Sequence, residues 1–383
     1  MNNFDYYNPV KILFGEGKID QLSKEIPKDA KILFTYGGGS IKKNGVYDKV
    51  KSGLKGFKVF EFGGIEPNPH FETLMKAVDI VKTEKIDFLL AVGGGSVLDG
   101  TKFIAAASLF DGDPWDILEK GAKVNNALPF GTILTLPATG SEMNSGGVIT
   151  KASTKVKLPF GSPLLFPKFS ILDPTTTYSL PAKQIANGIV DAFIHTTEQY
   201  LTYPSNSPIQ DRFAEGILKT LIEIGPQAIS NPEDYQTRAN FMWSCTMALN
   251  GLIGTGVPSD WATHMIGHEL TAFFGLDHGV TLAIVLPALL REMKDDKREK
   301  LLQFGKNVWG IEYGTEDNRI DEAIIRTVSF FNSLGVKTKL SAYGITVDQL
   351  APIFERFQSR QWKLGERKNI TPNRIEVILK SAL

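Results

Sequence analysis

The sequence has very little cysteine, because Cys245 is the only one among 383 residues. A single thiol excludes an internal disulfide framework and any structural zinc or iron–sulfur site built on cysteine. It also favours a reducing compartment, since proteins that live in oxidising surroundings tend to carry paired cysteines. We therefore expect a cytoplasmic protein.

Net charge is absent as well, because 42 basic side chains balance 42 acidic ones. A balanced chain gives no electrostatic footprint for nucleic acid or for an acidic membrane surface. We expect neither as a partner. The hydrophobic fraction of 42% is nevertheless high enough to build a core.

A long apolar run is also missing. The longest mostly apolar stretch spans residues 280–290, whereas a membrane helix needs roughly 18 or more residues. The first residues lack the basic-then-apolar layout of a secretory signal. These absences again favour a cytoplasmic protein.

The first half of the chain alternates short apolar runs with helical periodicity. Such alternation predicts an α/β fold with a parallel sheet covered on both faces. The expected strands are residues 31–36, 57–62, 86–92, 131–136 and 169–172.

The pattern changes after Asp173 and Pro174, beyond which only helical periods are found. The last of them, residues 372–382, follows Thr371 as its expected cap. The sequence thus predicts an α/β domain over residues 1–178 and an all-helical domain over residues 179–383.

Two loops in the α/β half share one layout, in which a strand runs into Gly-Gly-Gly-Ser and then into a helix. They span residues 37–40 and 93–96. Glycine lets backbone N–H groups approach a phosphate, and a helix N-terminus adds a favourable dipole. Neither loop is a P-loop or an ordinary Rossmann fingerprint. We interpret the pair as a nucleotide site, while tight turns that bind nothing are the alternative.

The first loop bears on the choice of cofactor. An acidic residue near such a strand end usually accepts the ribose hydroxyls of NAD, and this loop has none. It carries Ser40, Lys42 and Lys43 instead, which suit a 2′-phosphate. The sequence therefore favours NADP(H), although both lysines also fit an exposed helix start.

Four of the five histidines fall in one part of the helical half. Asp191 and His195 lie four residues apart on one helix face, as do His264 and His268, and His278 follows closely. Three imidazoles and a carboxylate suit Fe(II) or Zn(II). Spacing alone leaves open whether His264 or His268 is a ligand, and hydrogen-bonded core histidines remain the alternative.

At this point the motifs resemble those of the iron-dependent, or group III, alcohol dehydrogenases. The resemblance is greatest to the NADPH-dependent aldehyde reductase and butanol dehydrogenase branch, and it covers essentially the whole chain. The motifs that carry it are residues 93–99, 136–142, 187–195, 267–270 and 277–279.

The resemblance implies a divalent metal, Fe(II) or Zn(II), with Asp191, His195, His264 and His278 as its ligands. It leaves His268 near the metal as a proton relay. It further implies that the α/β domain binds the dinucleotide, that the active site lies in the cleft between the two domains, and that the protein is a homodimer.

The resemblance also implies a set of cofactor contacts. These are Gly38, Gly39 and Ser40 at the adenosine end, Gly94, Gly95, Ser96 and Asp99 at the pyrophosphate, and Thr135, Thr139 and Lys157 toward the nicotinamide. The usual Thr-Ala-Gly-Thr-Gly-Ser-Glu of the family is altered here, because Pro137 and Ala138 precede Thr139.

The resemblance therefore implies reversible hydride transfer between NADP(H) and short-chain primary alcohols or aldehydes. A glycerol-type polyol dehydrogenase of the same superfamily is one alternative. A metal-dependent hydrolase or lyase of a phosphorylated substrate is another, and a nucleotide-binding regulator without turnover is a third. Net consumption of NADPH distinguishes a dehydrogenase from the last two classes.

Overall fold

The computed structural model describes residues 1–383 and divides into two compact units. The α/β unit comprises Tyr7–Leu180 and Pro232–Thr246. The helical unit comprises Met1–Tyr6, Pro181–Asn231 and Met247–Leu383. The division into domains 1–178 and 179–383 stays a prediction, and residues 232–246 group with the α/β unit.

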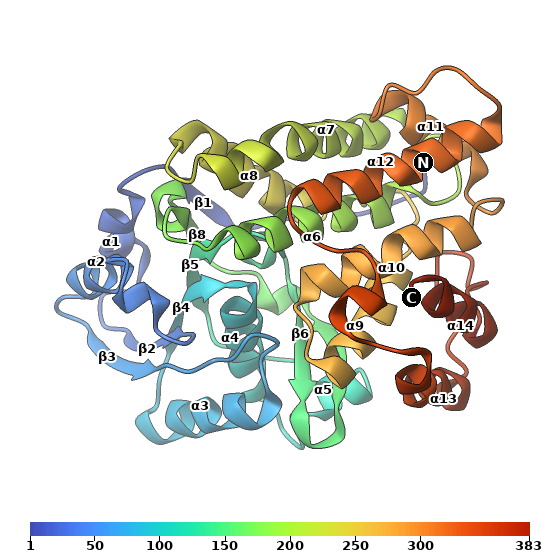
Figure 1. The fold of residues 1–383 in the computed structure, drawn as a ribbon. Helices are drawn as coiled ribbons and strands as arrows, with labels where there is room; N and C mark the ends of the chain where they lie inside the picture. The colour runs from blue at the N-terminus through green and yellow to red at the C-terminus, as the bar shows by residue number, and fades with distance from the viewer. The chain divides into compact units, whose positions relative to one another are not determined.

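A six-stranded sheet forms the centre of the α/β unit, and all of its strand pairs are parallel (Figure 1). The expected parallel sheet is thus confirmed. In spatial order its strands are β1 (Lys11–Phe14), β8 (Phe169–Leu172), β5 (Phe130–Leu136), β4 (Phe88–Gly94), β2 (Lys31–Tyr36) and β3 (Lys58–Phe62).

Successive side chains of these strands enter two different cores. Leu33 belongs to one buried cluster, whereas Ile32 and Phe34 belong to the other. Because strand side chains alternate between the two faces, both faces of the sheet must be covered. The helices of this unit are α1 (Leu22–Glu25), α2 (Val46–Gly53), α3 (Phe71–Glu84), α4 (Gly95–Ala107) and α5 (Asp116–Glu119). Residues 235–246 of α8 (Tyr235–Ala248) are added from later in the chain.

A separate antiparallel hairpin is formed by β6 (Gly146–Lys151) and β7 (Val156–Gly161). We did not expect it from the sequence, because Gly146, Gly147 and Pro159 interrupt the alternation that identifies a strand. The short strand β1 was also not expected.

The helical unit has no strand in any named sheet, as the sequence predicts. Its helices are α6 (Ala182–Tyr200), α7 (Pro208–Ser230), α9 (Ala262–Phe274), α10 (His278–Glu292), α11 (Arg298–Asn307), α12 (Glu316–Ser333), α13 (Ala351–Arg360) and α14 (Pro372–Ser381). The expected cap is confirmed, because the Thr371 side chain accepts from the Arg374 N–H.

Helix α6 is the central element of this unit. It is buried from Ile185 to Tyr200, and α10 packs against both α6 and α9 (Figure 1). A helix that is buried all round belongs to a core or a membrane span, and no helix here has the length and apolar character to cross a bilayer. Polar side chains on α6 therefore lie inside the protein, where each needs a partner.

Candidate functional site

One face of α6 carries three of the buried polar groups. Asp191, His195 and Glu198 follow one another at intervals of four and three residues, which places them on the same side of the helix. All three are almost completely buried.

The neighbouring helices bring the remaining histidines to this face. His264 and His268 lie on α9, and His278 is the first residue of α10. The Oδ1 atom of Asp191 lies 3.5 Å from His195 Nδ1, 3.6 Å from His264 Nε2 and 3.7 Å from His278 Nε2.

These distances are too long for hydrogen bonds and fit a shared cation. Ligands about 2.0–2.2 Å from a tetrahedral metal lie about 3.3–3.6 Å from one another. Asp191 Oδ1 and His264 Nε2 are buried and make no hydrogen bond, although buried polar atoms are normally satisfied. Asp191, His195 and His264 can hold a metal ion. The donor set therefore fits Fe(II) or Zn(II).

Glu198 is a functional candidate that our sequence reasoning missed. Its Oε2 contacts His264 Nδ1, and its Oε1 accepts hydrogen bonds from the Thr263 and His264 N–H groups at 2.6 and 3.4 Å. A carboxylate on one ring nitrogen fixes the tautomer, so that Nε2 keeps its lone pair toward Asp191. The available signal was the spacing of seven residues from Asp191 on the same helix face.

The charges in this cluster reinforce one another. Burial alone raises the pKa of Asp191, but His195, His278 and His264 outweigh it and hold that pKa well below its ordinary value. Burial lowers the pKa of His264, yet Glu198 and Asp191 together raise it to about 9. A cation is thus favoured at this position, whether it is a proton or a metal.

The start of α10 determines where His278 lies. Asp277 precedes it, and Asp277 Oδ2 accepts from Lys183 Nζ at 2.7 Å and from Asn187 Nδ2 at 3.2 Å. A side chain at Gly279 would collide with the Asn187 backbone, since an added Cβ would lie 2.6 Å from its carbonyl oxygen. Glycine at 279 therefore lets α10 approach α6 closely enough to place His278.

His268 lies at the edge of the cluster. Its ring centre is 6.3 Å from that of His264 and 5.4 Å from that of His278. The ring centre of Trp261 lies 6.2 Å from that of His195 and 5.5 Å from that of His264. The structure thus gathers the four predicted ligands with His268 beside them, while their roles stay predictions.

In the α/β unit, the second glycine loop joins β4 to α4. An added Cβ on Gly94 would lie 2.9 Å from Leu136, and one on Gly95 would lie 2.5 Å from Thr139. These glycines therefore bring the start of α4 against the end of β5. Thr135 occupies the same strand end and is buried.

Ser96 and Lys157 converge on one residue beside this loop. Ser96 Oγ accepts from the Asn68 N–H at 3.3 Å, and Lys157 Nζ donates to Asn68 Oδ1 at 2.9 Å. The structure therefore brings Lys157, from the hairpin, close to the predicted pyrophosphate loop.

Both carboxylate oxygens of Asp99 accept hydrogen bonds from the protein itself. Its Oδ1 accepts from Ser141 Oγ at 2.6 Å, and its Oδ2 accepts from the Val148 N–H at 3.0 Å. Its expected contact with the cofactor stays a prediction, while its hydrogen bonds tie α4 to the segment after β5.

The first glycine loop is more open. Gly38 and Ser40 are exposed, and Gly39 adopts a positive φ of 93° at the start of a short 3₁₀ turn. Lys42 Nζ lies 4.9 Å from the ring centre of Tyr36 and 5.1 Å from that of Tyr47. Two aromatic faces thus hold this ammonium beside the loop.

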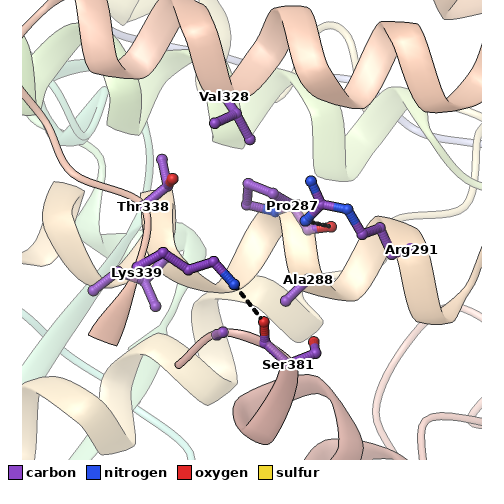
Figure 2. Close-up of a pocket in the computed structure, with 9 residues that line it drawn as sticks. Pro287, Ala288, Arg291, Val328, Thr338, Lys339 and Ser381 are labelled. Carbon is purple, nitrogen blue, oxygen red and sulfur yellow. Dashed lines mark hydrogen bonds between the residues drawn. The ribbon is translucent and has the colours of Figure 1, made fainter. Parts of the chain in front are cut away.

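A separate pocket lies between α10, α12 and α14 (Figure 2). Its lining includes Pro287, Val328 and Lys339, and none of the predicted site residues. Lys339 donates to the Ser381 carbonyl at 2.7 Å, as Figure 2 shows. Because this pocket has no metal ligand or acid–base pair, the histidine cluster remains the candidate centre.

Comparison with known proteins covers nearly the whole chain. The family model for iron-containing alcohol dehydrogenase matches residues 9–174. The model for the C-terminal part of the Fe-containing alcohol dehydrogenase family matches residues 185–383.

Individual relatives match over similar lengths. The chain is 58% identical over 375 residues to the NADPH-dependent aldehyde reductase YqhD of Escherichia coli, covering 97% of each chain. A crystal structure of that E. coli protein matches with a TM-score of 0.99 at 56% identity, covering 100% of this chain and 99% of that one.

Two further relatives differ in the cofactor that their names give. One is NADP-dependent alcohol dehydrogenase 3 of Entamoeba histolytica, 46% identical with 97% of this chain and 96% of the relative covered. The other is the probable NADH-dependent butanol dehydrogenase 1 of Bacillus subtilis, 44% identical with 100% of each covered.

Proposed function

Because this chain belongs to the iron-containing alcohol dehydrogenase family, we propose that it interconverts short-chain aldehydes and primary alcohols with NADP(H). This proposal depends on one observation: three imidazoles have a ring nitrogen within 3.5–3.7 Å of Asp191 Oδ1. In the reductive direction a hydride passes from NADPH to the carbonyl carbon, and a proton joins the carbonyl oxygen. Oxidation of the alcohol is the reverse.

The residues that would hold the metal are Asp191, His195, His264 and His278. Bound Fe(II) or Zn(II) supplies Lewis-acid polarisation of the substrate oxygen. Asp191 provides a buried negative charge, and Glu198 keeps the proton of His264 on Nδ1. Burial of Asp191, His195 and His264 keeps bulk water away from them and strengthens their electrostatic interactions.

The two glycine loops would bind the dinucleotide. Gly94 is the N-cap of α4, and Gly95 and Ser96 are its first residues. Backbone N–H groups and the helix dipole favour a pyrophosphate there. Gly38, Gly39, Ser40 and Lys42 would receive the adenosine end with its 2′-phosphate, and Thr135, Thr139 and Lys157 the nicotinamide end. Relatives named for NADPH and NADP support this assignment.

His268 would move the proton. It lies beside the ligands rather than among them, and its imidazole would pass a proton between the substrate oxygen and solvent. We expect His268→Ala to retain the metal and to slow turnover, with a changed dependence of kcat on pH. Metal content and pH–rate profiles check this, and an unchanged profile would contradict the relay.

Metal-dependent consumption of NADPH tests the proposal as a whole. The chelated protein should lose activity with short aldehydes and regain it on addition of Fe(II) or Zn(II). NADH and glycerol serve as comparisons. Faster turnover with NADH would overturn the cofactor assignment, and no turnover with any aldehyde would overturn the function.

The state of the protein in the cell is part of the same proposal. We propose a homodimer in the cytoplasm, where reducing conditions suit the single buried cysteine. Sedimentation of the purified chain and fractionation of cells measure these two properties.

A further inference from the structure

A buried lysine in the helical unit has no role in the chemistry described so far. Lys297 directly precedes α11, and its side chain is only 1% exposed. Its ammonium lies 2.9 Å from Asp260 Oδ2, 2.9 Å from Glu366 Oε2 and 2.7 Å from the Leu201 carbonyl oxygen. The two carboxylates are themselves 3% and 5% exposed.

Asp260 connects the buried Lys297 to the helices that carry the histidine cluster. Its Oδ1 accepts from the Ala262 N–H at 3.0 Å, where α9 begins. Its own N–H donates to the Glu198 carbonyl oxygen at 2.8 Å. Asp260 thus ties the beginning of α9 to the helix that carries Asp191.

The residue between Asp260 and Ala262 is under conformational constraint. Trp261 has a φ of 62°, which is unusual for a bulky residue and persists only where the surroundings impose it. Its ring borders His195 and His264. A change at Asp260 therefore acts on the ring of Trp261 and on the first turn of α9 together.

We propose that Lys297 is a positioning residue of the histidine centre, which holds Asp260 so that α9 begins at Ala262 and presents His264 to Asp191. The inference rests on the proposed metal centre. Without the ammonium, two carboxylates would share one buried space, and Asp260 would be driven away from Ala262. Glu198 alone would then fix the first turn of α9.

A neighbouring lysine provides a matched control. Lys300 is also buried, at 6% exposure, and its ammonium pairs with Asp211 at 2.7 Å. It lies over the ring of Tyr200, so its partners are on α7 and at the end of α6. Loss of this pair should destabilise the protein without disturbing α9.

The test compares Lys297→Met, Asp260→Asn and Lys300→Met with the wild-type chain. Two quantities are measured: the affinity for Co(II) with its visible absorption, and hydrogen exchange over residues 261–266 of the metal-free protein. We expect the first two variants to bind Co(II) about 10–100-fold more weakly, with a changed spectrum and faster exchange. Lys300→Met should leave affinity, spectrum and exchange within about twofold of wild type.

The outcomes separate the two proposals. A folded Lys297→Met protein with the affinity and exchange of Lys300→Met overturns the positioning role. If Lys297→Met does not fold, Asp260→Asn decides by the same criteria. If the wild-type chain binds no Co(II), the proposed function fails, and the exchange measurement still decides the role of Lys297.

Discussion

At the scale of single residues, Glu198 determines which nitrogen of His264 can face a metal. Glu198→Gln keeps the size of the side chain but presents an amide N–H₂ as well as an oxygen. A donor facing Nδ1 would move the ring proton to Nε2 and block the lone pair there. We expect Zn(II) affinity to fall about 10–100-fold, measured by competition with a chelator.

The control for this substitution is another buried glutamate of the helical unit. Glu215 accepts from Tyr200 Oη at 2.9 Å and from Asn307 Nδ2 at 2.7 Å, and it touches no histidine. Glu215→Gln should keep the affinity of the wild-type chain. Equal losses in the two variants would mean that Glu198 acts only through general stability.

Lys42 is the residue on which cofactor choice can be tested. Its ammonium is held over Tyr36 and Tyr47, whereas the adjacent Lys43 makes no such contact. We expect Lys42→Ala to raise the KM for NADPH roughly tenfold, as the loss of a charge-assisted contact does. The KM for NADH should stay unchanged. Steady-state kinetics with both cofactors measure this.

Lys43→Ala is the matched comparison, because it removes the same charge one position later. A smaller effect at Lys43 than at Lys42 is the expected order. If Lys42→Ala raised both KM values equally, the side chain would serve the loop and not the 2′-phosphate.

Some single-residue roles could be predicted from the sequence and others could not. Helical spacing placed Asp191 and His195 on one face, and the structure brings them together. The same spacing relates His264 to His268, so it could not choose between them. The family resemblance chooses His264, whose Nε2 lies 3.6 Å from Asp191 Oδ1 in the structure.

At the scale of elements, α4 is anchored to the segment after β5 by a buried cation. Lys102 Nζ donates to Asn144 Oδ1 at 2.8 Å and to the Gly146 carbonyl at 2.7 Å. Burial lowers its pKa from 10.5 to about 8, although Asp99 and Glu142 oppose that shift. The start of α4, with its glycine loop, is therefore held by a group that titrates in the alkaline range.

This shift predicts how stability depends on pH. Between about pH 8 and pH 10.5 the unfolded chain binds a proton at Lys102 that the folded chain does not. The contribution of Lys102 to folding stability is therefore complete above pH 10.5, the pKa of this lysine in the unfolded chain. It is lost as pH falls toward 8, by at most about 1.4 kcal/mol per pH unit.

Denaturant unfolding of the wild type and of Lys102→Met across this range measures the effect. The difference in unfolding free energy should shift in favour of the wild type as pH rises. Other alkaline titrations cancel in this difference. Parallel curves would show that Lys102 keeps its ordinary pKa in the folded protein.

The hairpin β6–β7 could not be predicted from the sequence for a physical reason. Strands β2, β4, β5 and β8 are buried apolar runs, so they could be predicted. The hairpin β6–β7 is stabilised by its pairing and by bonds from α4, such as that between Asp99 and the Val148 N–H. Those interactions come from residues far away in the chain, so local patterning contains no signal for them.

At the scale of the whole molecule, two separate segments of the chain, Tyr7–Leu180 and Pro232–Thr246, form the α/β unit. Met242 on α8 lies in the same buried cluster as Leu33 and Leu89. Thr246 Oγ1 donates to Glu142 Oε1 at 2.5 Å, which again joins α8 to the segment after β5. The sequence predicts only helices in this part of the chain, but periodicity could not reveal which unit α8 completes.

The two units should respond to different ligands. The histidine cluster lies wholly within the helical unit, and the glycine loops lie wholly within the α/β unit. A ligand that binds only the folded state stabilises it by about 4 kcal/mol at a thousandfold excess over Kd. At short exchange times, however, amide exchange reports local openings near each site.

Removal of the metal should therefore leave a localised signature. We expect chelation to accelerate hydrogen exchange in α6, α9 and the start of α10, and Zn(II) to reverse it. NADP⁺ should instead protect residues 37–40 and 93–102. The variant His264→Ala is the control, because it should abolish the Zn(II) effect and retain the NADP⁺ effect. Protection of the glycine loops by Zn(II) as strong as that of α9 would contradict the assignment of the metal to the histidine cluster.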